Sequence, residues 1–199
     1  VNSGAFINRV LVQPDGKYIV AGDFTQISSV NRGRIARLNT NGTLDATFNP
    51  PGGANAAVND IALQPDGKIV VAGDSSGDMA VARYQPDGAL DTAFSEDGLL
   101  TIDFYTLGDA GKAVIMQPDG KLILAGSANF CDEADFALAR LTAGGSLDRS
   151  FEGDGLLLSY IIEISDFGSA LLQQPDGKLV VAGYIDGDSG SDFLVARFK

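Results

Sequence analysis

The chain has 199 residues, of which 26 are acidic and 14 basic, so its net charge is −12, and it contains no histidine and one cysteine, Cys131. The excess of acid argues against nucleic acid as a partner, because that binding depends on Lys and Arg neutralising phosphates. The missing histidine excludes Ser-His-Asp catalysis and His-ligated zinc, and a single cysteine excludes an intrachain disulfide framework.

One phrase, an apolar run followed by a turn and a second apolar run, occurs at residues 10–22, 61–73, 114–126 and 171–183. The turn in each copy is Gln-Pro-Asp-Gly, in which Pro suits the first corner and Gly tolerates a positive φ. The second run, such as IVVAG, is apolar at nearly every position, which is typical of a strand buried on both faces. Each copy therefore predicts a β-hairpin whose second strand lies deep in a core.

A third strand is predicted at 34–38, 80–84, 137–141 and 194–198. A second repeated turn follows the first three of these strands and leads into a weaker fourth strand, clearest as GLLTIDF and GLLLSY. Four strands in a period of about fifty residues are typical of the blades of a propeller. A parallel β-helix has shorter coils, helical repeats need a 3.6-residue period, and an immunoglobulin-like sandwich gives no reason for internal copies.

We therefore predict an all-β fold, a single β-propeller domain built from four repeats, each a four-stranded antiparallel meander. The blades are expected at about 7–52, 58–105, 112–161 and 168–199, and the last blade lacks its outer strand. Two arrangements are open: the four blades close into a ring, or they form an arc of a larger propeller. We expect closure, because an open arc would expose two apolar blade faces.

The phrases QPDGK(I/L)VVAG, (A/V)AR(L/Y/F) and G(S/T/A)LDxxF resemble the bacterial delta-60 repeat family, and the resemblance covers almost the whole chain. The resemblance implies a β-propeller that is part of a large secreted or cell-surface bacterial protein, with no assigned chemistry. No apolar run approaches the ~20 residues of a membrane span, so membrane insertion is not expected.

In a meander the second-to-third and fourth-to-first connections share one end of the propeller, and here they differ in every repeat. The second-to-third connections are acidic, with Asp23, Asp74, Asp78, Asp132, Glu133, Asp135, Asp186, Asp188 and Asp192. These residues are either solvated loop tips or a site for a cation or a basic partner.

The sharpest local pattern is DGDSGSD, in which Asp186, Asp188 and Asp192 have the spacing of a calcium loop. The pattern departs from an EF-hand loop at Gly190 and Ser191 and lacks the closing Glu. Calcium at these three residues is the one metal that the sequence suggests, and no other cofactor is expected.

The repeated Arg is expected to pair with an Asp across the turn that follows it. If Leu141 faces Leu147, then Arg140 lies opposite Asp148, and the same count pairs Arg83 with Asp91 and Arg37 with Asp45. We expect structural ion pairs here and not catalytic carboxylates. Arg197 has no such partner and should lie unpaired or find a substitute.

The preferred interpretation of function is a non-enzymatic propeller module that serves as a scaffold or interaction surface. A carboxylate pair could still hydrolyse glycosides, but the chain has no Trp to stack a sugar. The alternative is a propeller that binds calcium or a glycan through its acidic end. The edge strand at 193–198 is expected to join a protein partner or a second copy, and Cys131 is expected to be unreactive.

Overall fold

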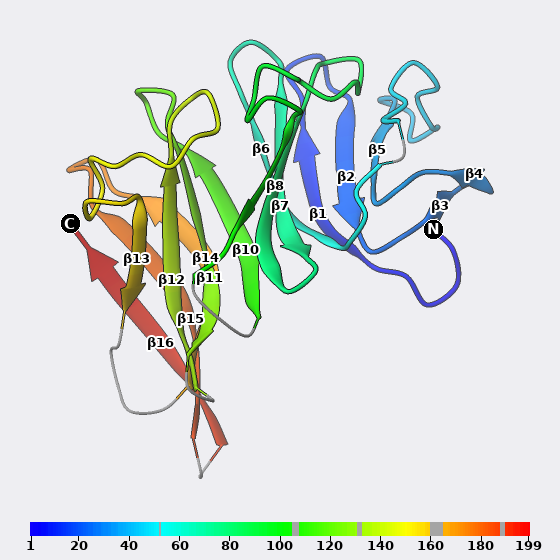
Figure 1. Cartoon of the computed structure of the whole chain (residues 1–199). Helices are drawn as coiled ribbons and strands as arrows, with labels where there is room; N and C mark the ends of the chain where they lie inside the picture. Colours follow the sequence, from blue (N-terminus) through cyan, green and yellow to red (C-terminus); the bar gives the residue numbers. More distant parts are fainter. Residues whose placement is uncertain (52, 105–107, 131–132, 160–164, 188–189) are drawn as a thin grey trace.

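The computed structural model describes residues 1–51, 53–104, 108–130, 133–159, 165–187 and 190–199, in which every helix or strand assigned is a β-strand. Four antiparallel sheets, the blades, lie side by side in chain order, and a small two-stranded sheet is added to the first (Figure 1). In these ranges no helix is long and apolar enough to cross a membrane. The predicted β-propeller architecture is confirmed.

Counted over the described residues, two blades have four strands and two have three. The four-stranded blades are blade 2, with β6 (Val58–Leu63), β7 (Ile69–Ser75), β8 (Asp78–Tyr84) and β9 (Leu99–Ile102), and blade 3, with β10 (Asp109–Met116), β11 (Leu122–Phe130), β12 (Glu133–Leu141) and β13 (Leu156–Ser159). The three-stranded blades are blade 1, with β1 (Ile7–Val12), β2 (Tyr18–Gly22) and β5 (Ile35–Leu38), and blade 4, with β14 (Ser165–Gln173), β15 (Leu179–Gly187) and β16 (Gly190–Phe198). The first strands of successive blades lie beside one another.

The repeated Ala-Gly that follows the apolar run has a steric cause. The first strand of each blade carries a β-bulge opposite this glycine. A Cβ on Gly126 would lie 1.8 Å from the carbonyl oxygen of Ala110, and one on Gly183 would lie 1.7 Å from that of Phe167. Only glycine therefore lets the bulged strand approach the second strand so closely.

The second strand of a blade packs against both neighbouring blades. In β7, Ile69 and Val71 join a hydrophobic cluster with Ile19 of blade 1, whereas Val70 packs in a different cluster with Leu122 of blade 3. These three residues of β7 are at most 3% exposed. The predicted burial of this strand on both faces is confirmed, and it follows from the alternation of side chains along a strand.

In the part of the chain that the structure describes, blade 1 has no outer strand, like blade 4, although only the last blade was expected to lack one. The sheet of blade 1 ends at β5. The chain at the place of the fourth strand contains Pro50 and Pro51, followed by glycines. Proline has no backbone donor for a ladder, so this segment runs as a loop past the edge of β5.

The four blades form an open row and not the closed ring that we expected, with blades 1 and 4 at opposite ends of the molecule (Figure 1). Part of the outward face of blade 1 is covered by its own second-to-third connection, which contains β3 (Gln26–Ile27) and β4 (Val30–Asn31) and buries Phe24 and Ile27 against Val20. This added sheet occupies the face that a neighbouring blade would need. No other repeat contains a copy of this sheet from which its position could be inferred.

Candidate functional site at the blade junctions

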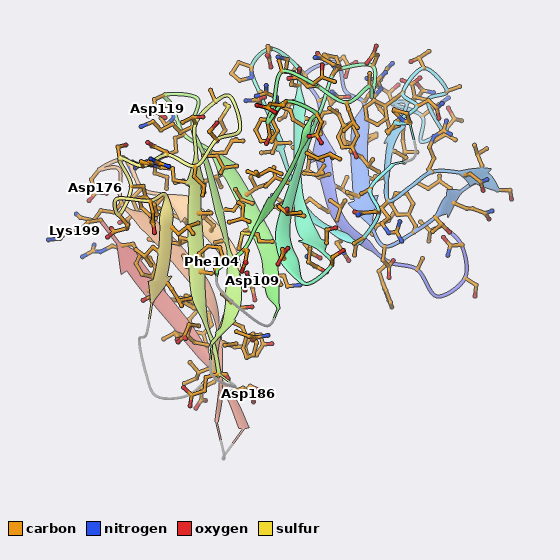
Figure 2. The ribbon with its side chains drawn as sticks, viewed as in Figure 1. Phe104, Asp109, Asp119, Asp176, Asp186 and Lys199 are labelled. Carbon is orange, nitrogen blue, oxygen red and sulfur yellow. The ribbon has the colours of Figure 1, made fainter. Side chains whose placement is uncertain are left out.

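The two kinds of connection lie at different ends of the blades. Figure 2 shows Asp119 and Asp176, in the Gln-Pro-Asp-Gly turns, near one end, and Asp109 and Asp186 toward the other. The variable connections with their carboxylates are therefore gathered away from the repeated turns.

The calcium loop suggested by the sequence does not form in the described residues. Strands β15 and β16 continue as a ladder, in which Asp186 pairs with Ser191 and Ile185 pairs with Asp192. Neighbouring rows of a ladder point to opposite faces, so Asp186 and Asp192 lie on opposite sides of the hairpin. Asp186 instead accepts a hydrogen bond from the Ser191 hydroxyl at 3.0 Å. Asp188 and Cys131 lie outside the described residues.

The structure brings three other carboxylates together, those of Asp78, Asp103 and Asp109, with one oxygen of each within 4.8 Å of the other two. We call this group the junction cluster. Asp78 begins β8 after a two-residue turn in which Ser76 and Gly77 both have positive φ, at 57° and 95°. Such a turn needs left-handed backbone at both positions, which explains the Gly.

Asp103 and Asp109 come from the connection between blades 2 and 3. Asp103 directly follows β9, and Asp109 is the first residue of β10. The backbone N–H of Asp109 donates to the carbonyl of Gly77 at 2.5 Å, which fixes the start of β10 against the β7–β8 turn. The cluster therefore spans the junction between two blades.

Asp109 is the buried member of the junction cluster, with 4% of its surface exposed. Its Oδ2 accepts a hydrogen bond from the N–H of the buried Phe104 at 2.7 Å, and a hydrogen bond from the backbone of Asn129 also favours its charged form. Burial raises the pKa of Asp109, and the charges of Asp103 and Asp78 raise it further. In the described chain, which includes every Lys and Arg, none forms an ion pair with Asp78 or Asp109.

The next junction repeats two of these positions. Asp135 in β12 corresponds to Asp78, because each lies five residues before the repeated Arg, and Asp166 in β14 corresponds to Asp109, because each lies eight residues before the repeated turn Gln. Both are buried, and Asp166 has an Oδ2 without a hydrogen-bond partner among the described residues. These spacings were present in the sequence, so a repeat-by-repeat comparison of the acidic positions could have found the pairs.

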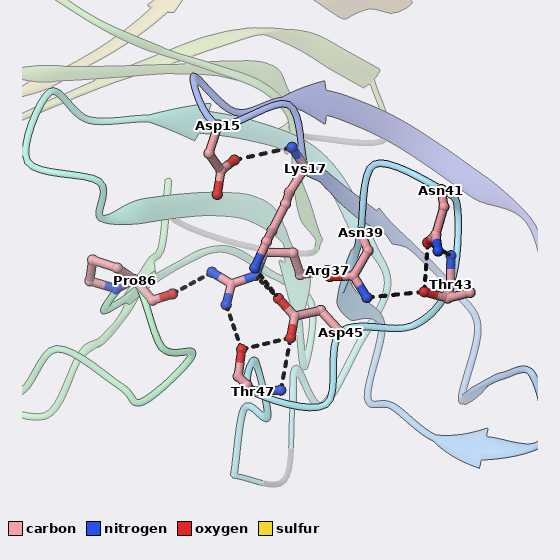
Figure 3. A network of polar contacts seen from close by, with 9 residues as sticks. All are labelled: Asp15, Lys17, Arg37, Asn39, Asn41, Thr43, Asp45, Thr47 and Pro86. Carbon is pink, nitrogen blue, oxygen red and sulfur yellow. Dashed lines mark hydrogen bonds and ion pairs between the residues drawn. The ribbon is translucent and has the colours of Figure 1, made fainter.

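The predicted Arg–Asp pairs are brought together in three blades, and Figure 3 shows the first. Arg37 Nε lies 2.8 Å from Asp45 Oδ2, and Arg37 also donates to the Thr47 hydroxyl at 3.1 Å and to the carbonyl of Pro86, in the following blade, at 2.7 Å. Lys17 from the first repeated turn reaches the same Asp45 oxygen at 2.8 Å. Burial alone would raise the pKa of Asp45, but the hydrogen bonds from Lys17, Thr47 and Arg37 hold this pKa well below its usual range.

The pairing of one Asp with an Arg and a Lys recurs in the next two blades. The Arg Nε to Asp Oδ2 distances are 2.6 Å for Arg83–Asp91 and 2.8 Å for Arg140–Asp148. Each of the three guanidinium groups also lies over a phenylalanine ring, Phe48, Phe94 or Phe151, at 4.7–5.1 Å from the centroid. The Lys, the Phe and, for Arg37 and Arg83, the carbonyl of the next blade were not predicted from the sequence, so the network is larger than the expected ion pair.

Blade 4 lacks the Asp of the second turn, and both of its cations are rearranged. Lys178, which corresponds to Lys17, pairs with Asp176 in its own turn at 2.5 Å. Arg197 has no carboxylate within ion-pair distance in the described chain, but its charge helps to lower the pKa of Asp176, after the larger contribution of hydrogen bonds from Lys178. The Arg–Asp pairs are therefore structural features of complete outer hairpins.

Solved structures that resemble this fold include carbohydrate-active enzymes. An endo-1,4-β-xylanase and an endo-arabinase, both from Bacteroides thetaiotaomicron, match 98% and 100% of this chain and 77% and 78% of their own, at 14% identity and TM-scores of 0.53 and 0.52. The α-L-arabinofuranosidase PaAbf62A from Podospora anserina matches 99% of this chain and 66% of its own, at 14% identity and a TM-score of 0.50. No curated protein sequence matches the chain.

These neighbours contradict the expectation that the chain is non-enzymatic, because its fold is one that carries catalysis. The expectation relied on the absence of His and Trp. Carboxylate chemistry needs neither, and the structure gathers carboxylates at the blade junctions. At this identity the likeness is one of fold.

The family is established by the repeats themselves. Residues 13–48, 64–94, 117–151 and 174–199 match the family described as a domain of unknown function (DUF5122) beta-propeller. These segments contain the repeated turns, the third strands and the Arg–Asp pairs, and together they make up more than half of the chain. The chain therefore belongs to the DUF5122 β-propeller family.

Proposed function

We propose that this chain is a calcium-binding β-propeller in which the junction cluster holds the ion between blades 2 and 3. The observation that carries the proposal is the approach of three carboxylates, Asp78, Asp103 and Asp109, to within 4.8 Å of one another. Like charges at this separation repel, and a divalent cation between them would turn that repulsion into attraction.

The donor set favours calcium among the common metals. Calcium takes oxygen ligands at about 2.3–2.6 Å, so two ligands on opposite sides of one ion lie about 5 Å apart. The oxygens of the junction cluster fall within that span. Zinc, copper and nickel prefer imidazole or thiolate, and magnesium requires a strict octahedron with shorter bonds and usually keeps several waters.

Binding would couple the two blades. Asp78 and Asp103 belong to blade 2, whereas Asp109 belongs to the first strand of blade 3. An ion that binds this folded junction and not the unfolded chain stabilises the fold by mass action, by about 2.7 kcal/mol at one hundred times its Kd. For a protein of this size that corresponds to a rise in Tm of about 5–10 °C.

The test compares the wild type with Asp78→Asn and with Asp186→Asn, by calorimetric titration with Ca²⁺ and by thermal melting with Ca²⁺ or EDTA. Asp78→Asn should lose the heat of binding and the rise in Tm. Asp186→Asn, which alters the site first suggested by the sequence, should retain both. Absence of Ca²⁺ binding to the wild type, or its loss in Asp186→Asn alone, would overturn the proposal.

An extracellular location, which the delta-60 resemblance implies, would suit such a site. Calcium sites of extracellular modules bind with Kd values of about 10⁻⁴–10⁻³ M, because calcium outside cells is plentiful. We therefore propose that the protein acts in the secreted or cell-surface compartment. Fractionation of the native bacterium with an antibody against this chain tests the location, and recovery in the cytoplasm alone would contradict it.

A further inference from the structure

A second feature, independent of the junction cluster, lies where the first strands of blades 2, 3 and 4 run beside one another. A hollow of about 240 Å³ is present there. It is lined mainly by Asn59 of β6, Lys112 of β10, Ser127 of β11, Phe167 and Ser169 of β14, and Tyr184 of β15. We call it the bulge hollow, because three of these residues sit at β-bulges.

Two positions of the repeat supply most of this lining. The first is the residue at the bulge of the first strand, five residues before the turn Gln, which is Asn8, Asn59, Lys112 or Ser169. The second is the residue directly after the repeated Ala-Gly, which is Asp23, Asp74, Ser127 or Tyr184. The repeat therefore brings corresponding residues of neighbouring blades to one place.

Blades 1 and 2 use the bulge residue to hold the next blade. Asn8 Nδ2 donates to the carbonyl of Val58 in blade 2 at 3.0 Å, and Asn59 Nδ2 donates to the carbonyl of Gly111 in blade 3 at 2.9 Å. Asn59 Nδ2 also donates to Asp74 at 3.2 Å, so the two repeat positions of blade 2 are bonded to one another. In these blades both positions have a structural role.

Blades 3 and 4 depart from this arrangement at the hollow. The ammonium of Lys112, whose side chain is 42% exposed, makes no hydrogen bond within the described chain, and its ion-pair partner Asp74 is 3.9 Å away, beyond hydrogen-bond distance. The hydroxyls of Ser127 and Ser169 also have no hydrogen-bond partner among the described residues, and neither hydroxyl is sealed from solvent. Three polar groups of one hollow are thus free to bind a ligand.

An aromatic pair completes the lining. Phe167 and Tyr184 face one another in the ladder of β14 and β15, and their rings stack with centroids 4.8 Å apart and planes 18° from parallel. Tyr184 remains 41% exposed. The stacking holds the Tyr184 ring in one orientation, so little conformational freedom is lost when a ligand packs against it.

We propose that the bulge hollow binds one neutral sugar residue. The hydroxyl groups of a sugar both donate and accept hydrogen bonds, and so match the ammonium of Lys112 and the hydroxyls of Ser127 and Ser169. The C–H groups on one side of a sugar ring pack well against the electron-rich face of an aromatic ring, which Tyr184 supplies.

Size and charge agree with this occupant. An engineered cavity of about 150 Å³ admits benzene, so a hollow of about 240 Å³ has room for one pyranose ring and its hydroxyl groups. An anion is disfavoured, because Asp74 partly neutralises Lys112 and the chain as a whole carries a net charge of −12. A purely apolar ligand would leave the polar groups without partners.

The experiment titrates the wild type with the methyl glycosides of glucose, galactose, xylose and arabinose, and with methoxycyclohexane, which has a ring of similar size but no hydroxyl groups. Inorganic phosphate serves as the anionic probe. Binding is followed by NMR shifts of the backbone amides of Gly168 and Ser169, with EDTA present so that the outcome does not depend on calcium at the junction cluster. At least one glycoside should bind, and methoxycyclohexane and phosphate should not.

Two variants test the polar and the aromatic parts of the lining, and both alter partly exposed side chains, so both should fold. Lys112→Met removes a charged donor and should weaken glycoside binding about tenfold, whereas Lys199→Met, at an exposed lysine outside the hollow, should not. Tyr184→Ala should weaken binding to a similar extent. Phe193→Ala is its control, because Phe193 faces Tyr184 in the ladder but does not line the hollow.

Binding of none of the four glycosides, or binding of methoxycyclohexane or phosphate in their place, would overturn the proposal. Glycoside binding that Lys112→Met and Tyr184→Ala leave as strong as their two controls do would also overturn it, because the sugar would then lie elsewhere on the protein.

Discussion

Asp166, at the start of β14, accepts a hydrogen bond from the backbone N–H of Phe136 in β12, and this contact places a buried carboxylate between blades 3 and 4. Burial raises the pKa of Asp166 to about 6, and the nearby charge of Asp135 contributes. The folded state thus binds the proton more tightly than the unfolded state does. The stability associated with Asp166 is greatest in acid and falls as the pH rises from about 4 through about 6.

Asp166→Asn should therefore stabilise the protein at pH 8 by about 1–3 kcal/mol, because the amide keeps an acceptor for Phe136 and removes a buried charge. Below about pH 4 the variant and the wild type should be equally stable. Urea denaturation between pH 3.5 and 8 measures the difference. Asp154→Asn is the matched control, since exposed Asp154 accepts a backbone hydrogen bond from Leu156 in the same way. A gain at pH 8 that persists unchanged at pH 3.5 would contradict the assignment to ionisation.

Removal of Arg83 should destabilise the protein strongly. Its guanidinium is 2.6 Å from Asp91, donates to the carbonyl of Ala143 in blade 3 at 2.6 Å, and lies over the Phe94 ring. Arg83→Ala would leave Asp91 buried with only Lys68 as a charged partner, and breaking such a pair costs about 3–5 kcal/mol.

Arg197→Ala is the control for Arg83, because it removes the same residue from a blade without the Asp. It should change the free energy of unfolding by less than about 0.5 kcal/mol. Arg83→Lys should fall between the two, since it keeps the charge but loses the donor to Ala143. If urea denaturation showed that the Arg83 and Arg197 substitutions lower the free energy of unfolding equally, the network would contribute nothing to stability.

Much of the fold was predictable because the repeat fixes register. The inference that Leu141 faces Leu147 placed Arg140 opposite Asp148, and the structure has Leu141 paired with Leu147. The prediction of a closed ring failed because it depended on a segment that no other repeat contains. The sheet of β3 and β4 that covers blade 1 has no counterpart elsewhere, so nothing indicated that it would occupy the face needed for ring closure.

The candidate site was harder to predict, because a local spacing can belong to two different structures. Asp186 and Asp192 read as part of a calcium loop, yet the same residues form a ladder that separates their side chains. The cluster of Asp78 and Asp109 joins residues of different blades, 31 positions apart, and only the packing of β10 against blade 2 brings them together.

Gly126→Ala should be severely destabilising. The added Cβ would lie 1.8 Å from the carbonyl oxygen of Ala110, so the bulged strand β10 would have to separate from β11. Steric overpacking of this kind costs about 1–3 kcal/mol and sometimes more. Gly144→Ala is the control, because its Cβ would meet only Thr142, at 3.8 Å, and should change stability by less than about 0.5 kcal/mol. Thermal melting of both variants measures the difference in stability, and similar Tm values for the two would refute the steric explanation.

The exposed end of blade 4 should cause self-association. In the other blades the face that looks toward the next blade is covered, as it is for Val70 and Ile123, which are fully buried. In blade 4 the corresponding face is open, with Val195 49% and Leu172 52% exposed. Beside it, β16 is the last strand of its sheet and has one unpaired edge. An open apolar face next to an open edge is the kind of surface that pairs with a second copy.

We therefore expect the wild type to form dimers through blade 4 as its concentration rises, as measured by sedimentation velocity. Val195→Lys should shift the equilibrium to the monomer, because it places a charge in the middle of the apolar face and next to the edge. Val10→Lys is the matched control: Val10 is a similarly exposed valine, at 53%, on a strand of blade 1. It should leave the dimer intact, because the added sheet of β3 and β4 already covers part of that end. A wild type that stays monomeric at high concentration, or a dimer that Val10→Lys disrupts as readily as Val195→Lys, would place the association elsewhere or exclude it.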